Sequence, residues 1–165
     1  MSSELVLTVL WASIIAIAAL YDLKYRRIPN VLSVLSWGLG AARFFMVYGW
    51  DEWPMSVWAF LATFTLGLLL TLMQILGAGD VKLMMGAALG IGLEDWPMVV
   101  FVTFALGAVI AVFRLVQKRN FLDFLQRLGF VFQGRFQPAL ELLDGKDRFP
   151  FGICILGGVL WYLAN

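Results

Sequence analysis

Long apolar stretches separated by short polar segments make up most of the chain. The stretches fall at about residues 5–21, 31–48, 54–76, 81–93, 97–113 and 149–164. A membrane-spanning helix needs about 20 apolar residues (range roughly 17–25), so the first three stretches and the fifth are long enough. Their apolar residues are uninterrupted, unlike the alternating pattern of membrane β-strands. The pattern predicts an all-α polytopic membrane protein with about six transmembrane helices.

The charges between these stretches give the expected orientation. Of the 12 Lys and Arg residues, all except Arg43 fall on one side of the membrane if the chain crosses it six times. The connections on the other side, 49–53 and 92–96, carry acids and no base. Because Lys and Arg are enriched in cytoplasmic connections, we assign the basic side to the cytoplasm and both termini to the opposite side. This alternation requires the short stretches 81–93 and 149–164 to cross as well.

The connection at about 114–148 is much longer than the others. Residues 120–132 within it place their apolar side chains on one helical face and their polar side chains elsewhere. This pattern predicts either an amphipathic helix in the cytoplasmic interface or a loop helix that packs on the protein itself. No additional domain of ordinary size fits in the chain, so residues 1–165 are expected to form a single membrane-embedded domain.

Composition supports this interpretation and excludes several kinds of chemistry. Hydrophobic residues make up 62% of the chain and charged residues 14%, with a mean hydropathy of +0.88. Soluble domains average about 45–50% apolar and 25% charged residues. The chain has no His and a single Cys, Cys154, which excludes His-dependent triads and the HExxH zinc site. Chemistry must therefore use carboxylates, Lys, Tyr, Ser or Thr, and we expect no metal and no organic cofactor.

Two acids stand apart from the others. Asp22 closes the first stretch in "AALYDLKYRRIPN", and Asp80 opens the fourth in "GAGDVKL", both at the expected cytoplasmic end. A charged residue within a membrane costs about 2.5–3.5 kcal/mol on insertion scales, so such residues usually serve a function. Two close carboxylates share a proton, and one can then activate water while the other protonates a peptide carbonyl. Gly77 and Gly79 would let a substrate backbone approach Asp80.

Each acid taken alone has a structural alternative. Asp80 could cap the fourth helix, and Asp22 could be a solvated acid paired with a neighbouring base of the segment 24–27. Neither alternative predicts two acids from different helices at one depth, and we therefore favour a catalytic pair. A proton relay in a small transporter or channel and a purely structural scaffold are further alternatives. A relay would favour acids spread through the membrane and an inverted repeat, and the sequence has neither.

The spacing of these residues resembles that of a known family. Asp22 with Ile28-Pro29-Asn30, then "GAGDVKL" (77–83), then "PFG" (150–152), is similar to the type IV prepilin peptidases, which are membrane aspartic proteases of the GxGD class. The resemblance implies six spans and catalysis by Asp22 and Asp80. It further implies supporting roles for Pro29, Asn30, Gly77, Gly79, Lys82, Pro150 and Gly152. Some of these also have simpler roles, because prolines begin helices and Lys82 adds positive charge on the cytoplasmic side.

The resemblance also implies a substrate and a location. The substrate would be a prepilin or pseudopilin whose short basic leader is cut at the cytoplasmic face of the bacterial inner membrane; apart from the lipid bilayer, no other partner and no nucleic acid is expected. The chain lacks the cysteine-containing insertion that longer members carry for methylation, and so it is similar to the short form found with tight-adherence (Flp-type) pili. A GxGD protease that cuts within the bilayer, as presenilin does, is the alternative. Acids at the edges of the spans argue against it.

Overall fold

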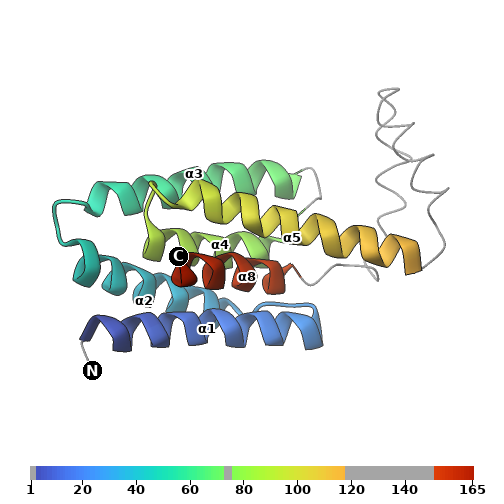
Figure 1. Ribbon diagram of the computed structural model, residues 1–165, viewed down its shortest axis with the longest axis horizontal. Coiled ribbons are helices and arrows are strands. Elements are labelled where there is room, and N and C mark those ends of the chain that lie inside the picture. Colours follow the sequence, from blue (N-terminus) through green and yellow to red (C-terminus); the bar gives the residue numbers. More distant parts are fainter. Residues whose placement is uncertain (1–2, 73–75, 118–150) are drawn as a thin grey trace. The chain divides into compact units, whose positions relative to one another are not determined.

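The structure is a computed structural model and describes residues 3–72, 76–117 and 151–165. These residues form six helices and no strand (Figure 1). The helices are α1 (Ser3–Tyr25), α2 (Asn30–Tyr48), α3 (Trp53–Leu72), α4 (Ala78–Ile91), α5 (Trp96–Gln117) and α8 (Gly152–Ala164). The predicted all-α fold class is confirmed, and each apolar stretch of the sequence contains one helix. The amphipathic helix expected over 120–132 lies outside the described residues.

Four of the described helices are long and apolar enough to cross a membrane. They are α1, α2, α3 and the part of α5 from Trp96 to Phe113. By contrast, α4 has 14 residues and α8 has 13. At a rise of about 1.5 Å per residue these two helices are roughly 20 Å long, which is less than the ~30 Å thickness of the hydrocarbon core. Six full crossings therefore stay a prediction.

The chain divides into two compact units. Unit 1 comprises Met1–Phe104 and Pro150–Asn165, and unit 2 comprises Ala105–Phe149. Within unit 2 the described residues are the second part of α5. The residues singled out from the sequence belong to unit 1, whose helices are described below.

The central helix of unit 1 is α4, and α1, α2, α3 and α8 all pack against it (Figure 1). Nine of its 14 residues are buried, and small residues such as Gly86 and Gly90 lie among them. A Cβ on Gly86 would collide with the Ser36 side chain of α2, and one on Gly90 would come within 2.7 Å of the Trp11 ring of α1. Small residues let membrane helices approach closely. They explain why α4 fits among four neighbours.

Proline and glycine residues mark the ends of α2 and α4. Pro29 and Gly77 precede these helices in extended conformations. Gly49 and Gly92 follow them with φ values of 79° and 87°, a region that L side chains rarely adopt. Pro29 directly precedes Asn30, the first residue of α2, in agreement with the simpler role of a proline at the beginning of a helix.

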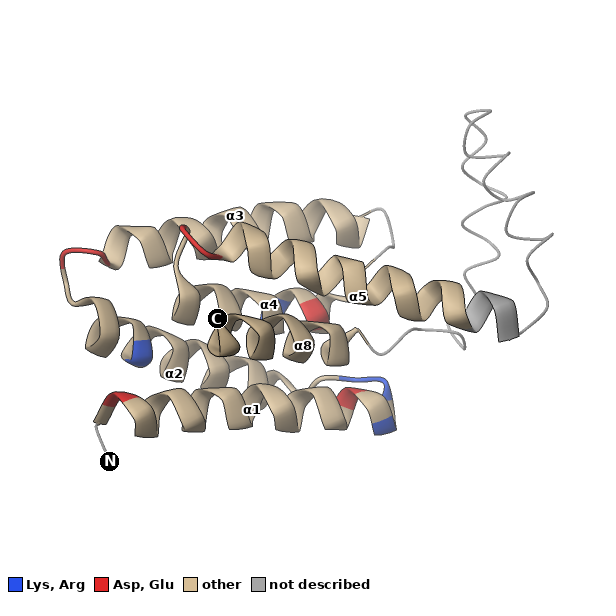
Figure 2. Ribbon diagram, in the orientation of Figure 1, with Lys and Arg blue, Asp and Glu red and all other residues tan. Residues whose placement is uncertain are grey.

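The links between the helices of unit 1 differ in charge between its two ends (Figure 2). The link between α1 and α2 contains Arg26 and Arg27, whereas the links 49–52 and 92–95 contain acids. The start of α4 belongs to the basic end, because the backbone of Gly79 lies against the Ile28 side chain of the α1–α2 link. The charge separation expected from the sequence is therefore present between the two ends of this unit.

Arg43, the exception among the Lys and Arg residues, is buried within unit 1 with 6% of its surface exposed. Its Nε donates a hydrogen bond to Thr8 Oγ1 at 3.1 Å, and its Nη1 donates one to the Gly90 carbonyl. The guanidinium also lies 5.1 Å from the ring centroid of Trp11 and 5.5 Å from that of Tyr162. Arg43 of α2 thus joins α1, α4 and α8 near the C-terminal end of α4, where helix carbonyls lack partners within their own helix.

Candidate active site

The two acids and most of the expected supporting residues lie where α1 ends and α2, α4 and α8 begin. Lys82 in the first turns of α4 donates a hydrogen bond from Nζ to Asn30 Oδ1 at 3.0 Å, which connects α4 to the first residue of α2. Gly152, the first residue of α8, donates its backbone N–H to Asp22 Oδ2 at 3.1 Å. We call this part of unit 1, with the four helix ends, the site end.

Asp22 is a buried acid in the last turn of α1. Its side chain is 6% exposed, which differs from the solvated interfacial acid of the structural alternative. The N–H of Gly152 gives the carboxylate a hydrogen bond, as a buried polar group requires. A Cβ on Gly152 would lie 3.2 Å from both Cβ and Oδ2 of Asp22, so α8 comes this close because it begins with glycine.

Asp80 is the third residue of α4. The residue before the helix is Gly77, so Asp80 is not the cap that the structural alternative supposed. Its side chain is half-buried, and its Oδ1 atom is buried. Its Oδ2 atom turns back toward the start of the helix, where a Cβ on Gly77 would lie 2.9 Å away. The absence of a side chain at Gly77 therefore makes the space that the carboxylate occupies.

The first turn of α8 approaches both acids. Gly152 is hydrogen-bonded to Asp22, and the Cys154 thiol, two residues later, lies close enough to the Asp80 carboxylate to interact with it electrostatically. Cys154 is fully buried. The first turn of α8 is therefore hydrogen-bonded to Asp22 and interacts electrostatically with Asp80.

Lys82 is held by hydrogen bonds to both its side chain and its backbone. Its amine bonds to Asn30, and its backbone carbonyl accepts a hydrogen bond from Trp37 Nε1 at 2.7 Å. Residues two positions apart on a helix point about 200° away from each other, which directs Lys82 toward α2 and away from the side of Asp80. Gly79 also packs against the link between α1 and α2, because a Cβ there would lie 3.4 Å from Ile28 Cβ, an ordinary packing distance.

Of the expected supporting residues, Pro150 lies outside the described residues. Conversely, Ile28, Trp37 and Cys154 contact the site end although we did not assign them roles from the sequence. Cys154 follows the "PFG" segment and Ile28 belongs to "IPN", so their position beside the motifs was the available signal. Among the described residues, no three His, Cys, Asp or Glu side chains gather as metal ligands would. A reaction without a cofactor stays a prediction.

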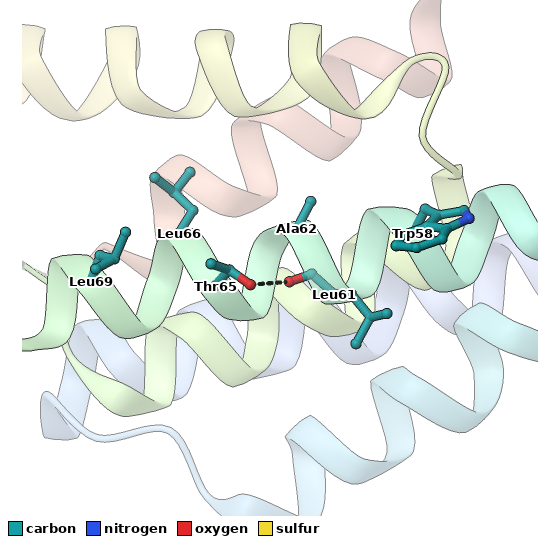
Figure 3. Close-up of a pocket in the computed structure, with 6 residues that line it drawn as sticks. All are labelled: Trp58, Leu61, Ala62, Thr65, Leu66 and Leu69. Atoms are coloured by element: carbon teal, nitrogen blue, oxygen red, sulfur yellow. Dashed lines mark hydrogen bonds between the residues drawn. The ribbon is translucent and has the colours of Figure 1, made fainter.

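A pocket of about 480 Å³ lies on α3 (Figure 3). It is lined by Trp58, Leu61, Ala62, Thr65, Leu66 and Leu69. The Thr65 hydroxyl donates to the Leu61 carbonyl of its own helix at 2.9 Å. Because none of these lining residues is acidic, the pocket offers no carboxylate for acid–base chemistry.

Comparison with known proteins agrees with these observations at the level of the family. The sequence profile of the type IV leader peptidase family matches residues 7–112, a range that includes Asp22 and Asp80 and ends before α8. Searches of curated proteins and of solved structures found no match. Because the matched range covers more than half of the 165 residues, the chain belongs to the type IV leader peptidase family.

Proposed function

We propose that the protein is a membrane aspartic endopeptidase that removes the short basic leader of a type IV prepilin or pseudopilin. Membership of the family supports a leader-peptidase-like protease. The aspartic mechanism is supported by one observation: buried Asp22 and half-buried Asp80, from separate helices, both interact with the first turn of α8, Asp22 through a hydrogen bond and Asp80 electrostatically. No metal or organic cofactor is needed for this reaction.

A pair of carboxylates at this place can hydrolyse a peptide bond by acid–base chemistry alone. The ionised carboxylate takes a proton from water, and the water oxygen forms a bond to the peptide carbonyl carbon. The protonated carboxylate gives its proton to the carbonyl oxygen. In the second step the C–N bond breaks, the carbonyl re-forms, and a proton transferred from the site makes the leaving nitrogen an amine. Two groups in opposite protonation states are therefore both required.

The charges of unit 1 suggest how the enzyme lies in the membrane. The end of α1, the α1–α2 link and the start of α4 contain Lys24, Arg26, Arg27 and Lys82. The links at the other end contain acids (Figure 2). Because basic residues favour the cytoplasmic side, the site end would face the cytoplasm of a bacterial inner membrane. The leader of the substrate would then lie in the cytoplasm and its apolar helix in the bilayer. Cleavage would take place at their boundary, with residues 1–165 acting as one membrane-embedded peptidase domain.

The direct test uses the full-length protein in detergent or liposomes with a synthetic prepilin-like peptide, made of a basic leader and an apolar helix. We expect mass spectrometry to find a single cut at the boundary between them, at a rate that a chelator or a thiol reagent changes by less than about twofold. The Asp22→Asn/Asp80→Asn double variant, purified in parallel, shows whether a contaminating protease is responsible. Intact peptide, or equal cutting by the double variant, would overturn the proposal.

A further inference from the structure

The beginning of α8 lies outside the range that matches the family, residues 7–112, and yet it contacts the candidate catalytic acids. Gly152 bonds to Asp22 through its backbone, and Cys154 lies near Asp80. The first turn of α8 therefore interacts with both acids, directly with Asp22 and electrostatically with Asp80. This placement raises the question of what the turn does for the acids.

The start of a helix has free backbone donors. The first four N–H groups of an α-helix have no carbonyl partner within the helix. Phe151 occupies the position before α8, so Gly152 carries the first of these N–H groups. It donates to Asp22 Oδ2 at 3.1 Å, in an environment where the Asp22 side chain is 6% exposed. Such a bond to a charged acceptor is stronger than one between neutral groups.

The bond makes the two oxygens of Asp22 different. Oδ2 accepts the amide proton of Gly152, and we therefore assign to Oδ1 the proton transferred from water. The bond restricts rotation of the carboxylate, and it keeps Oδ1 in one direction while substrate binds. Reaction rates depend steeply on such placement, since a misplacement of about 1 Å can cost about a hundredfold in rate.

Glycine is the residue that permits this contact. A Cβ at position 152 would lie 3.2 Å from the Cα of Ala19 as well as 3.2 Å from Asp22 Cβ and Oδ2. The Ala19 atom belongs to the backbone of α1 and cannot move independently of that helix. A side chain at 152 would therefore push α8 away from α1 and lengthen the bond to Asp22.

We infer that Gly152 is a positioning residue for catalysis, and that its backbone N–H holds Asp22 Oδ2 so that Oδ1 faces the attacking water. The inference rests on the proposed peptidase function and adds to it a named group in α8. According to this inference, the Gly152 amide itself positions Asp22, and the lack of a side chain at residue 152 is not sufficient. That distinction can be tested, because the amide can be removed without adding an atom.

The test replaces the Gly152 amide by an ester, through incorporation of glycolic acid at position 152 of the full chain. This change exchanges N–H for O and leaves the packing intact. The matched control is the same replacement at Gly158, in the middle of α8, where the lost N–H bonds within the helix. Both proteins are assayed with the prepilin-like peptide at several concentrations, next to the unmodified protein and Asp22→Asn.

We expect the ester at Gly152 to lower kcat about tenfold or more, as loss of a hydrogen bond to a charged group does, with KM changed less than about twofold. The ester at Gly158 should leave kcat within about twofold. Gly152→Ala should lower kcat at least as much as the ester at Gly152, because its Cβ also displaces α8.

Three results would overturn the inference. They are an unchanged kcat for the ester at Gly152, an equal loss for both esters, and a change confined to KM, which would indicate substrate contact. In each of them the unmodified protein still cleaves and Asp22→Asn does not, so the proposed function stands. If the unmodified protein does not cleave the peptide, the proposed function fails first, and the inference fails with it.

Discussion

The charged residues at the two ends of α4 have different surroundings. At the C-terminal end, the Gly90 carbonyl accepts a hydrogen bond from Arg43, whose guanidinium is enclosed by a hydroxyl and two aromatic rings from other helices. At the N-terminal end, Asp80 lies between the helix start at Gly77 and the first turn of α8. One charge is surrounded by side chains that join helices, and the other lies among glycines and helix ends.

This difference shows that a buried charge in a membrane protein is not by itself a sign of catalysis. Arg43 has the surroundings of a structural residue, because each group around it fills space or accepts a bond. Asp22 and Asp80 are instead bordered by glycines, Gly152 beside Asp22 and Gly77 beside Asp80. The two regions are about 15 Å apart along α4, at about 1.5 Å per residue, and can therefore be perturbed separately.

The largest expected effect is on the activity of the acids. Asp22→Asn and Asp80→Asn should each lower the cleavage rate by about a thousandfold or more, because each removes one of the two protonation roles. Mass spectrometry of the peptide product measures the rate, and Asp51→Asn, at an exposed acid in the link before α3, is the matched control. An Asn variant with near-normal turnover would remove that acid from the catalytic pair.

The opposite result is expected at Arg43. Arg43→Met should lower the free energy of unfolding by about 2 kcal/mol, because it leaves the buried Gly90 carbonyl and Thr8 hydroxyl without their donor. The kcat of the folded protein should stay within about twofold. Arg43→Lys keeps the charge but not the planar guanidinium group. Its free energy of unfolding should fall between those of the unmodified protein and Arg43→Met. Unfolding in mixed micelles gives the stability, and a stable Arg43→Met protein that has lost kcat would place Arg43 with the acids.

A smaller effect is expected at Gly77. Gly77→Ala places a Cβ 2.9 Å from Asp80 Oδ2, so the carboxylate must move, and we expect kcat to fall about tenfold with little loss of stability. Gly38→Ala in α2 is the matched control, because a Cβ there meets nothing within 4 Å. The measurement is the steady-state cleavage rate of each of the two variants. Equal rates would show that the position of Asp80 does not depend on Gly77.

The smallest effect is expected for the bond between Lys82 and Asn30. Asn30 is exposed and Lys82 is half-buried, so Lys82→Met and Asn30→Ala should each lower activity only about threefold, as loss of a modest hydrogen bond does. The double variant should be no worse than either single variant, because both remove the same bond. Losses that multiply in this double-mutant cycle would show that the two residues act independently.

The helices could be predicted closely from the sequence because their limits are local. Apolar stretches and flanking glycines or prolines fix most boundaries, and the stretch expected at 81–93 corresponds to α4 at Ala78–Ile91. The sequence could not show that α4 is the central helix. That position depends on Gly86 and Gly90 meeting Ser36 and Trp11, residues that lie far away in the chain.

The site was predictable to a lesser degree. Asp22 and Asp80 stand out because acids are rare in apolar stretches, and in the structure the turn that begins with Gly152 bonds to Asp22 and interacts electrostatically with Asp80. The hydrogen bond between Gly152 and Asp22 had no signal of its own, since every residue except proline carries the same N–H. Arg43 likewise looked like an exception to the charge pattern, because its partners in α1, α4 and α8 are distant in sequence.

The position of α8 in the chain has a consequence for how the protein is assembled during synthesis. Asp22 belongs to the first helix and Gly152 begins the last described one, so α8 is synthesised after the helices against which it packs. Until then one side of α4 is uncovered, and Asp22 has no amide from α8. If the proposed function holds, we expect a nascent chain to have both acids in place but no peptidase activity until synthesis of the chain has passed α8.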